Sequence, residues 1–162
     1  MGKYGLNGTD KYHQGEYRIK NPIKYIGDPT LILYRSSWEY KFMLYCDLNP
    51  GVLKWGSEII KIPYIDRLGI SHMYIPDFYL ETKDTKNEGQ MNKFLVEVKP
   101  EEETYQPVIP INITVNKMKQ LEYKMAMWMK NSYKWSYAVE WCKARDIKFW
   151  LVTMEQLKYL KP

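Results

Sequence analysis

Apolar side chains recur at helical spacing in the segment that begins near Ser36. The recurring residues are Trp38, Phe42, Tyr45 and Leu48. They are three or four positions apart, which places them on one face of a helix. Ser36 is a favourable N-cap, and Glu39 three residues later completes the sequence pattern of a capping box. Asn49-Pro50-Gly51 then interrupts the period, so the pattern predicts a helix from about residue 36 to residue 49.

Alternation with a period of two replaces the helical period after Gly51, and it predicts three strands. They cover residues 52–65, 71–81 and 92–99. Asp66 to Gly69 forms a hairpin turn between the first two, and the polar loop from Lys83 to Gly89 precedes the third. The residues that share the face of Glu97 on the third strand are Leu95 and Lys99, and those that share one face on the second are Met73, Ile75, Asp77 and Tyr79.

The rest of the chain returns to helical spacing. It predicts an amphipathic helix from Val115 to about Met129, a second helix from about Tyr133 to Arg145 and a strand over residues 148–152. Thr153 and Gln156 then form the capping box of a short last helix. The element order is αβββααβα. We therefore expect an α/β fold in which a mixed central sheet is flanked by helices on both sides.

The composition is that of one globular domain. The chain has 162 residues, of which 45% are hydrophobic and 27% charged. Residues 1–30 show no sustained period and are expected to form an irregular N-terminal arm, held by Tyr25 and Ile26, with the folded domain over residues 31–162. The arm has three open interpretations: a subunit contact, a nucleic-acid contact or a frayed end. The longest apolar segments are too short to cross a membrane.

The net charge and the cysteine and histidine content limit which partners and metal sites are plausible. The net charge of +5 favours an acidic partner. Cys46 and Cys142 are far apart and form no CxxC pair, so they are interpreted as small core residues. His13 and His72 are the only histidines, which is too few for a typical zinc site.

Two carboxylates and a lysine give the sequence its candidate chemistry. Glu97 and Lys99 share a strand face, with Cα atoms about 7 Å apart. If the strand that carries Asp77 pairs with theirs, the two carboxylates meet at one end of the sheet. Such oxygen ligands suit Mg²⁺ or Mn²⁺, which activate water and neutralise phosphate charge. Lys99 would orient the water or stabilise the transition state, and Glu39 would add a third carboxylate from the helix.

Each of these residues also has a purely structural interpretation. A capping box fully explains Glu39. Asp77 could simply follow Pro76 at a strand bulge, and Glu97 with Lys99 could be a solvated stripe on an edge strand. The chemical interpretation gains weight because Asp77 and Glu97 lie in otherwise apolar strand segments, where an unpaired carboxylate is costly.

Several sequence blocks, together with the element order, resemble the PD-(D/E)xK nuclease superfamily. The blocks are Lys24-Tyr25-Ile26-Gly27-Asp28, Tyr34-Arg35-Ser36-Ser37-Trp38-Glu39, Asn49-Pro50-Gly51-Val52-Leu53-Lys54-Trp55, Ser57-Glu58, Ile62-Pro63-Tyr64, Pro76-Asp77-Phe78, Glu97-Val98-Lys99-Pro100 and Val152-Thr153-Met154-Glu155. Within the superfamily, the chain resembles the head completion nucleases of T-even-like tailed phages. These are related to the endonuclease subunit of a Tn7-type transposase. The resemblance extends from about Asn21 to Leu157.

The resemblance implies a Mg²⁺- or Mn²⁺-dependent DNA endonuclease that acts in phage head completion and maturation, before the tail is attached. It implies the catalytic residues Glu39, Asp77, Glu97 and Lys99, of which Asp77, Glu97 and Glu39 are the metal ligands. The expected location is the host cytoplasm during assembly, and the virion head or neck. Expected partners are DNA, bound without strong sequence specificity, and phage portal or neck proteins, with no membrane.

Two other functions remain open from the sequence. One is a non-catalytic head completion or neck assembly protein that keeps a nuclease-like fold. The other is a host-side nuclease for repair or junction resolution. Candidate phosphate contacts are Lys41, Lys117, Lys119, Lys124 and the arm residues Lys11, Arg18, Lys20 and Lys24, although each also suits an ordinary solvated face. Glu101-Glu102-Glu103 is interpreted as a solvated turn.

Overall fold

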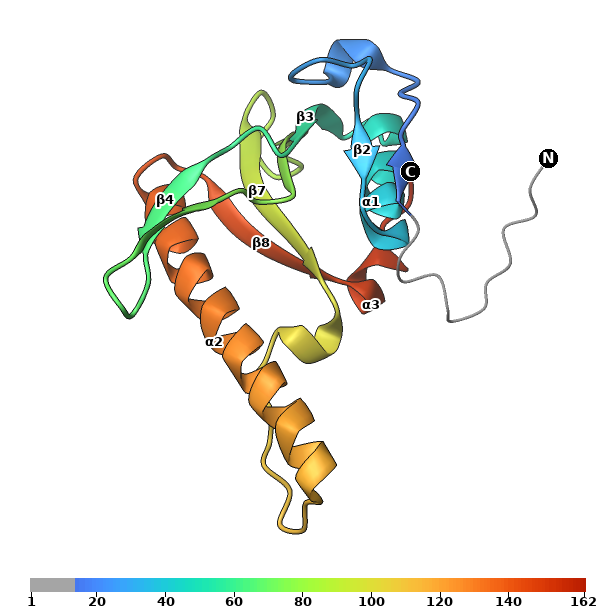
Figure 1. The fold of residues 1–162 in the computed structure, drawn as a ribbon. Helices are drawn as coiled ribbons and strands as arrows, with labels where there is room; N and C mark the ends of the chain where they lie inside the picture. Colours follow the sequence, from blue (N-terminus) through green and yellow to red (C-terminus); the bar gives the residue numbers. More distant parts are fainter. Residues whose placement is uncertain (1–13) are drawn as a thin grey trace, which may run out of the picture.

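A central four-stranded sheet organises the computed structural model, which describes residues 14–162 (Figure 1). Its strands are β3 (Val52–Ser57), β6 (Phe78–Lys83), β7 (Met91–Lys99) and β8 (Lys148–Thr153), in the order β3-β6-β7-β8. The β3/β6 and β6/β7 pairs are antiparallel, whereas β7 and β8 are parallel. The expected mixed sheet is therefore confirmed.

Helices cover both faces of this sheet, as Figure 1 shows. Helix α1 (Ser37–Leu48) and the short helix α3 (Met154–Leu157) pack on one face, and the long helix α2 (Val115–Lys143) packs on the other. Side-chain alternation along β7 explains the two cores. Val96 and Val98 face α1 and α3, while Leu95 faces α2. The result is a three-layer α/β fold of the predicted class.

The helix caps predicted from the sequence are present. The Ser36 side chain accepts a hydrogen bond from the Glu39 backbone N–H and begins α1, whose buried face carries Phe42, Met43 and Cys46. Thr153 and Gln156 form the expected capping box at α3. These local signals define the helix starts because they satisfy backbone N–H groups that have no partner within the helix.

The two long strands predicted for residues 52–65 and 71–81 are each broken, which corrects the sequence interpretation. A separate two-stranded sheet, made of β4 (Ile62–Ile65) and β5 (Ser71–Tyr74), continues beyond β3 and β6. Glu58 sits at the break with a left-handed φ of 54°, and its N–H donates to the carbonyl of Asp77. Pro76, which has no N–H to donate, precedes Asp77. The hairpin therefore bends away from the sheet at Asp77.

The tip of this hairpin is the predicted turn. The Asp66 N–H donates to the Ile70 carbonyl, and Gly69 takes a left-handed φ of 79°. The Asp66 carboxylate accepts from the backbone N–H groups of Leu68 and Ile70, each at 2.9 Å. An aspartate that bonds to nearby backbone in this way favours a tight turn.

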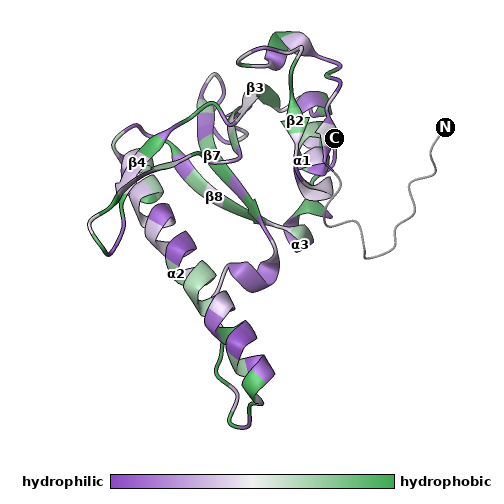
Figure 2. Cartoon of the chain, viewed as in Figure 1, coloured by the Kyte–Doolittle hydropathy of each residue, from purple (hydrophilic) through white to green (hydrophobic). Residues whose placement is uncertain are grey.

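Helix α2 is a single element rather than the two helices predicted. Lys130, Asn131 and Ser132, where a break was expected, contain neither glycine nor proline, so the helix continues through them. Its second half buries Trp135, Ala138 and Cys142 against the sheet. In its first half, Val115 and Met118 of the apolar stripe are exposed, whereas Leu121, Met125 and Met129 are partly buried. Figure 2 shows hydrophobic residues at this end of α2 and on the loop before it.

Residues 14–30 lie against the domain. Strand β1 (Gly15–Glu16) pairs with β2 (Leu33–Tyr34), and the short 3₁₀ helix η2 (Pro22–Lys24) follows β1. The buried Asp47 carboxylate of α1 accepts hydrogen bonds from the Tyr17 hydroxyl at 2.8 Å and from the Lys20 N–H at 2.8 Å. Ile26 donates its N–H to the Trp55 carbonyl at 2.7 Å. The domain boundary near residue 30 stays a prediction.

Candidate active site

The pairing of β6 with β7 brings Asp77 and Glu97 together. Phe78, the first residue of β6, lies opposite Val96 in this antiparallel pair; Asp77 directly precedes Phe78, and Glu97 directly follows Val96. The Asp77 Oδ2 accepts a hydrogen bond from the Val98 N–H at 2.7 Å, which turns this carboxylate toward β7. The two acids thus meet at the end of the sheet where the hairpin bends.

Glu97 is buried, and each of its carboxylate oxygens contacts neighbouring polar groups. The Tyr74 hydroxyl donates to its Oε2 at 2.7 Å. The ammonium groups of Lys99 and Lys134 lie 3.3 Å and 3.2 Å from its Oε1. Lys99 reaches it from two positions along β7, and Lys134 reaches it from α2. A buried carboxylate with three such partners has a fixed orientation.

The pKa shifts of Asp77 and Lys99 reflect their short distances from Glu97. Burial, followed by the negative charge of Glu97, raises the pKa of Asp77 well above its usual range. The Val98 N–H and the Lys99 ammonium lower this pKa, but they do not offset the rise. For Lys99, burial lowers the pKa, whereas Glu97, Asp77 and Glu103 raise it and prevail, so its ammonium form is favoured. The site therefore holds acids that repel each other beside a firmly charged lysine.

Glu39 lies at the N-terminus of α1 and serves as part of the helix cap. Its carboxylate accepts hydrogen bonds from the Arg35 N–H at 2.9 Å and from the Ser36 hydroxyl at 3.0 Å. Its charge also raises the pKa of Asp77, so the two carboxylates are electrostatic neighbours. The Glu39 side chain thus contacts the Arg35 N–H and the Ser36 hydroxyl rather than the Ser36 N–H of the predicted capping box, and its role as a third ligand stays a prediction.

Two residues of the site were missed by the sequence analysis. Tyr74 reaches Glu97 only because the hairpin bends, and no sequence signal marks that contact. Lys134 follows Tyr133 on α2, next to the buried Trp135, and its ammonium also lies 4.8 Å from the centre of the Tyr74 ring. Its position beside the buried stripe of α2 was the available signal, but this helix carries many lysines.

The donor set fits a hard divalent cation. Asp77 and Glu97 offer carboxylate oxygens, and Mg²⁺ commonly uses one or two carboxylates while it keeps waters and substrate phosphate as its other ligands. The mutual repulsion expressed in the pKa of Asp77 is relieved by a cation between the two acids. Within residues 14–162, no three side chains of His, Cys, Asp or Glu gather as a preformed metal cage. The residues thus suit a cation completed by water and phosphate.

The surrounding charges are distributed unevenly. Glu101 to Glu103 form a 3₁₀ turn (η3) in which Glu101 and Glu102 are exposed, while Glu103 acts on Lys99. The candidate phosphate-binding lysines Lys41, Lys117, Lys119 and Lys124 are exposed. The Lys24 ammonium instead donates to the carbonyls of Asp47 and Asn49 at the end of α1. Lys11 lies outside the described residues.

Comparison with known sequences supports the same interpretation of the site. Residues 49–154 match the family described as "TnsA-like endonuclease N terminal", and this range includes Asp77, Glu97 and Lys99. The chain belongs to the TnsA-like endonuclease family. The predicted relation to nucleases of the PD-(D/E)xK type is therefore confirmed.

The chain is also similar to a phage protein over almost its whole length. The "Head completion nuclease" of Enterobacteria phage T4 is 37% identical over 149 residues, which cover 91% of this chain and 95% of that protein. Because the match covers almost all of both chains, it includes α1, the hairpin and the whole of α2. In the part of the chain that the structure describes, no helix has both the length and the apolar character needed to cross a membrane.

Proposed function

We propose that this protein is a Mg²⁺- or Mn²⁺-dependent DNA endonuclease that acts in phage head completion. One observation carries the proposal: Asp77, which accepts from the Val98 N–H, lies near Glu97 and the Lys99 ammonium at the end of the β6–β7 pair, in a chain of an endonuclease family. Paired carboxylates with a neighbouring lysine are suited to hydrolysis of a phosphodiester bond.

Each residue has a distinct proposed role. Asp77 and Glu97 hold the cation, with Glu39 as a third carboxylate near them. The bound cation would lower the pKa of a water molecule and neutralise charge on the phosphate. Lys99, held by Glu97, orients the attacking water and stabilises the charge that grows on the phosphate oxygens. Lys134 and Tyr74 keep the Glu97 carboxylate in place.

The biological setting is proposed from the phage T4 relative. Its name assigns it to head completion, and the two chains match over nearly their whole lengths. We propose that this protein acts at the same stage, before tail attachment, in the host cytoplasm and at the head or neck of the virion. Its net charge of +5 favours binding to DNA phosphates, with little sequence specificity.

The direct test is cleavage of plasmid, linear duplex and single-stranded DNA by the purified protein, with Mg²⁺, Mn²⁺ or EDTA. We expect cleavage that requires a divalent cation and falls by about 10²–10³-fold in Asp77→Asn and Glu97→Gln. The control is Asp84→Asn, because Asp84 is a partly exposed loop aspartate next to the opposite end of β7 from Glu97. Wild-type protein that leaves every DNA form intact with both metals would contradict the proposal.

One observation favours a second candidate, a non-catalytic assembly protein of the head or neck. The loop before α2 exposes Val108, Ile109 and Ile111, and the helix then exposes Val115 and Met118. Contiguous apolar surface of this kind is typical of a protein contact, here with portal or neck proteins. Complementation separates the candidates. If the protein acts only in assembly, phage that carry Asp77→Asn mature normally. Under the same hypothesis, phage that carry Val108→Ser, Ile109→Ser and Ile111→Ser produce defective heads.

A further inference from the structure

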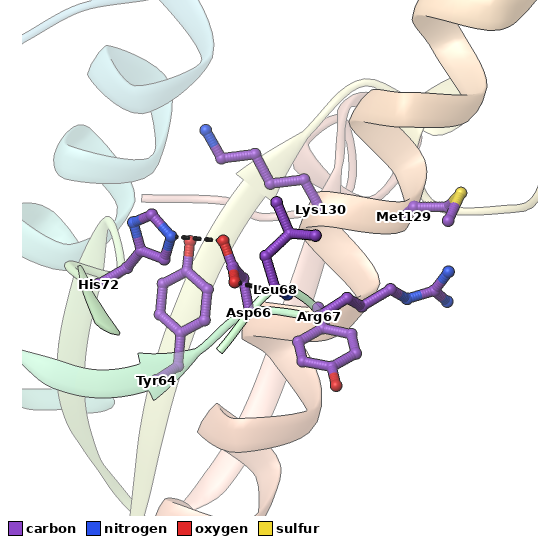
Figure 3. Close-up of a pocket in the computed structure, with 8 residues that line it drawn as sticks. Tyr64, Asp66, Arg67, Leu68, His72, Met129 and Lys130 are labelled. Atoms are coloured by element: carbon purple, nitrogen blue, oxygen red, sulfur yellow. Dashed lines mark hydrogen bonds and ion pairs between the residues drawn. The ribbon is translucent and has the colours of Figure 1, made fainter. Parts of the chain in front are cut away.

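A cavity lies between the bent hairpin and α2, outside the carboxylate site. Its volume is about 340 Å³, within the range of sites that bind small organic groups. Figure 3 shows its walls. The hairpin contributes Tyr64, Asp66, Arg67, Leu68 and His72, and α2 contributes Met129, Lys130 and Tyr133.

Aromatic rings and cations dominate these walls. The Tyr64 and His72 rings are stacked, with centroids 5.2 Å apart and planes 25° from parallel. Figure 3 shows the two rings side by side. The Arg67 guanidinium lies 5.8 Å from the centre of the Tyr133 ring, and Lys130 is exposed at the rim. Rings provide stacking surfaces for a nucleobase, and the two cations complement phosphate.

Among the residues 14–162 that line the cavity, Asp66 is the one acid, and its carboxylate already accepts hydrogen bonds. Its Oδ1 accepts from two backbone N–H groups of the turn, and its Oδ2 lies 2.8 Å from Nε2 of His72. These hydrogen bonds lower the pKa of Asp66, the bond with His72 most of all. Asp66 therefore shapes the turn and orients the His72 ring, while Arg67 and Lys130 remain to meet an anion.

The cavity adjoins the carboxylate site along both elements that form it. On the hairpin, the Tyr64–His72 pair is two residues, or about 7 Å, from the pair that contains Tyr74, whose hydroxyl contacts Glu97. On α2, Tyr133 immediately precedes Lys134, whose ammonium contacts Glu97. Lys130 is about 6 Å further along the helix axis. The cavity therefore lies next to Tyr74 and Lys134, which contact Glu97.

We infer that the hairpin–α2 cavity binds one unpaired nucleotide beside the scissile phosphate, and that the preferred substrate is DNA with a single-stranded segment. This inference rests on the proposed nuclease function. A base stacks on the Tyr133 or His72 ring, and Arg67 and Lys130 contact the adjoining phosphates. A base within a duplex cannot enter the cavity because it is stacked and paired, so an unpaired strand binds without the energetic cost of unstacking.

The test measures binding rather than cleavage. Fluorescence anisotropy in EDTA gives the affinity of the full-length protein for a forked duplex with a single-stranded tail and for a blunt duplex. We expect Tyr133→Leu and Arg67→Gln to weaken binding of the forked DNA, the former by about 5- to 150-fold, with much smaller effects on the blunt duplex. Arg67 is exposed, so Arg67→Gln is expected to fold even if Tyr133→Leu does not.

Two matched controls are available, one on α2 and one just after its C-terminal end. Tyr123→Leu removes an exposed ring from α2 away from the cavity. Arg145→Gln removes a guanidinium that also lies over a ring, that of Trp141 at 4.2 Å, but outside the cavity. Both controls should bind the forked DNA as wild type does. Circular dichroism and thermal melting establish that each variant is folded.

Photocrosslinking gives a second readout that reports contact directly. An oligonucleotide with 5-iododeoxyuridine in its unpaired tail should crosslink to Tyr133, His72 or Tyr64, as identified by mass spectrometry. Equal affinity of wild type and folded Arg67→Gln for the forked DNA, or crosslinks only elsewhere, would overturn the inference. Metal-dependent cleavage in that case leaves the proposed nuclease intact. If instead the wild-type protein cleaves no DNA but crosslinks at the cavity, the proposed nuclease function is contradicted and the inferred nucleotide binding is supported.

Discussion

The Asp77 carboxylate lies in an environment that disfavours its charge, and the proposed metal-binding role explains this arrangement. It lies near Glu97 at the end of the β6–β7 pair, and burial and the Glu97 charge raise its pKa. Only the Val98 N–H and Lys99 act in the other direction. An arrangement selected for stability alone would replace one of the acids, because unfavourable charge of this kind typically persists at functional sites.

The raised pKa of Asp77 predicts a pH-dependent gain in stability for Asp77→Asn. The folded protein binds this proton more tightly than the unfolded chain does, so the charged carboxylate destabilises the fold. This cost is absent below the ordinary pKa of aspartate. It grows as the pH rises through the interval up to the folded pKa, and above that it is fully present. Asp77→Asn, which still accepts from Val98, should therefore raise the melting temperature more at pH 8 than at pH 4.

Thermal melting of the metal-free protein at both pH values checks this sign. Asp84→Asn is the matched control, because hydrogen bonds from Asn87 and Lys86 lower the pKa of Asp84. That substitution should reduce stability at pH 8 and have little effect at pH 4. An Asp77→Asn variant that melts below wild type at pH 8 would show that the Asp77 charge is well stabilised.

Lys134 is expected to affect cleavage through Glu97. Its ammonium contacts the Glu97 carboxylate from α2, and loss of such a partner to a metal ligand, the role proposed for Glu97, typically costs about 10–100-fold in activity. Lys134→Met should show this loss, while Lys134→Arg retains most activity. Titration of folded Lys134→Met with Mn²⁺ by calorimetry shows whether the substitution weakens metal binding, as expected if Lys134 positions Glu97. The exposed Lys124→Met on the same helix is the control, and equal activity of Lys134→Met and wild type would contradict the role.

At the scale of elements, one buried side chain joins the N-terminal segment to α1. The Asp47 carboxylate accepts from Tyr17, Lys20 and Asn21, and Tyr17 is itself buried. We expect Asp47→Ala to lower the free energy of unfolding by about 3 kcal/mol, because several donors lose their partner, and Tyr17→Phe by about 1.5 kcal/mol. Urea denaturation measures both. Equal effects would mean that the Tyr17 bond alone carries the attachment.

Helix α2 combines a packed half and an exposed half. Its second half buries Trp135, Ala138 and Cys142, whereas its first half exposes Val115, Met118 and Tyr123. Most helical stability in proteins comes from tertiary packing. Hydrogen exchange should therefore be faster by at least about tenfold for amides 119–128 than for amides 135–142. Uniform protection along α2 would imply that another surface covers its first half in solution.

The sequence predicted the elements whose signals are local. Ser36 and Thr153 mark helix starts by their caps, and the alternation around Glu97 defines β7 and its two faces. The bend at Glu58 could not be predicted, because it depends on a left-handed residue and on a hydrogen bond to Asp77, both set by tertiary structure. The alternation of residues 52–65 continues across that bend, so periodicity alone indicates one strand.

For the site, the sequence predicted the residues on paired strands and missed those brought by packing. Asp77, Glu97 and Lys99 follow from strand period and pairing. Tyr74 and Lys134 come from the hairpin and from α2, and no spacing relates them to Glu97. Contacts between elements that are not adjacent in a sheet depend on how the layers pack, which local patterns do not encode.

At the scale of the whole molecule, the three layers converge on one end of the sheet. Helix α1 begins there with Glu39, the hairpin bends there at Asp77, and α2 passes over it with Lys134. The sheet provides a rigid base for the carboxylates, and the β4–β5 hairpin packs against one end of α2 (Figure 1). This arrangement leaves the carboxylates beside the cavity proposed to hold an unpaired nucleotide.

The most direct test of the central claim is anomalous diffraction from crystals of the wild-type protein soaked in Mn²⁺. We predict a manganese peak between Asp77 and Glu97, within about 2.1 Å of an oxygen atom of each. Crystals of Asp77→Asn should lose that peak or show it much weakened. A wild-type map with no peak at these two carboxylates, or with manganese only at other surface acids, would contradict the claim that they form a metal site.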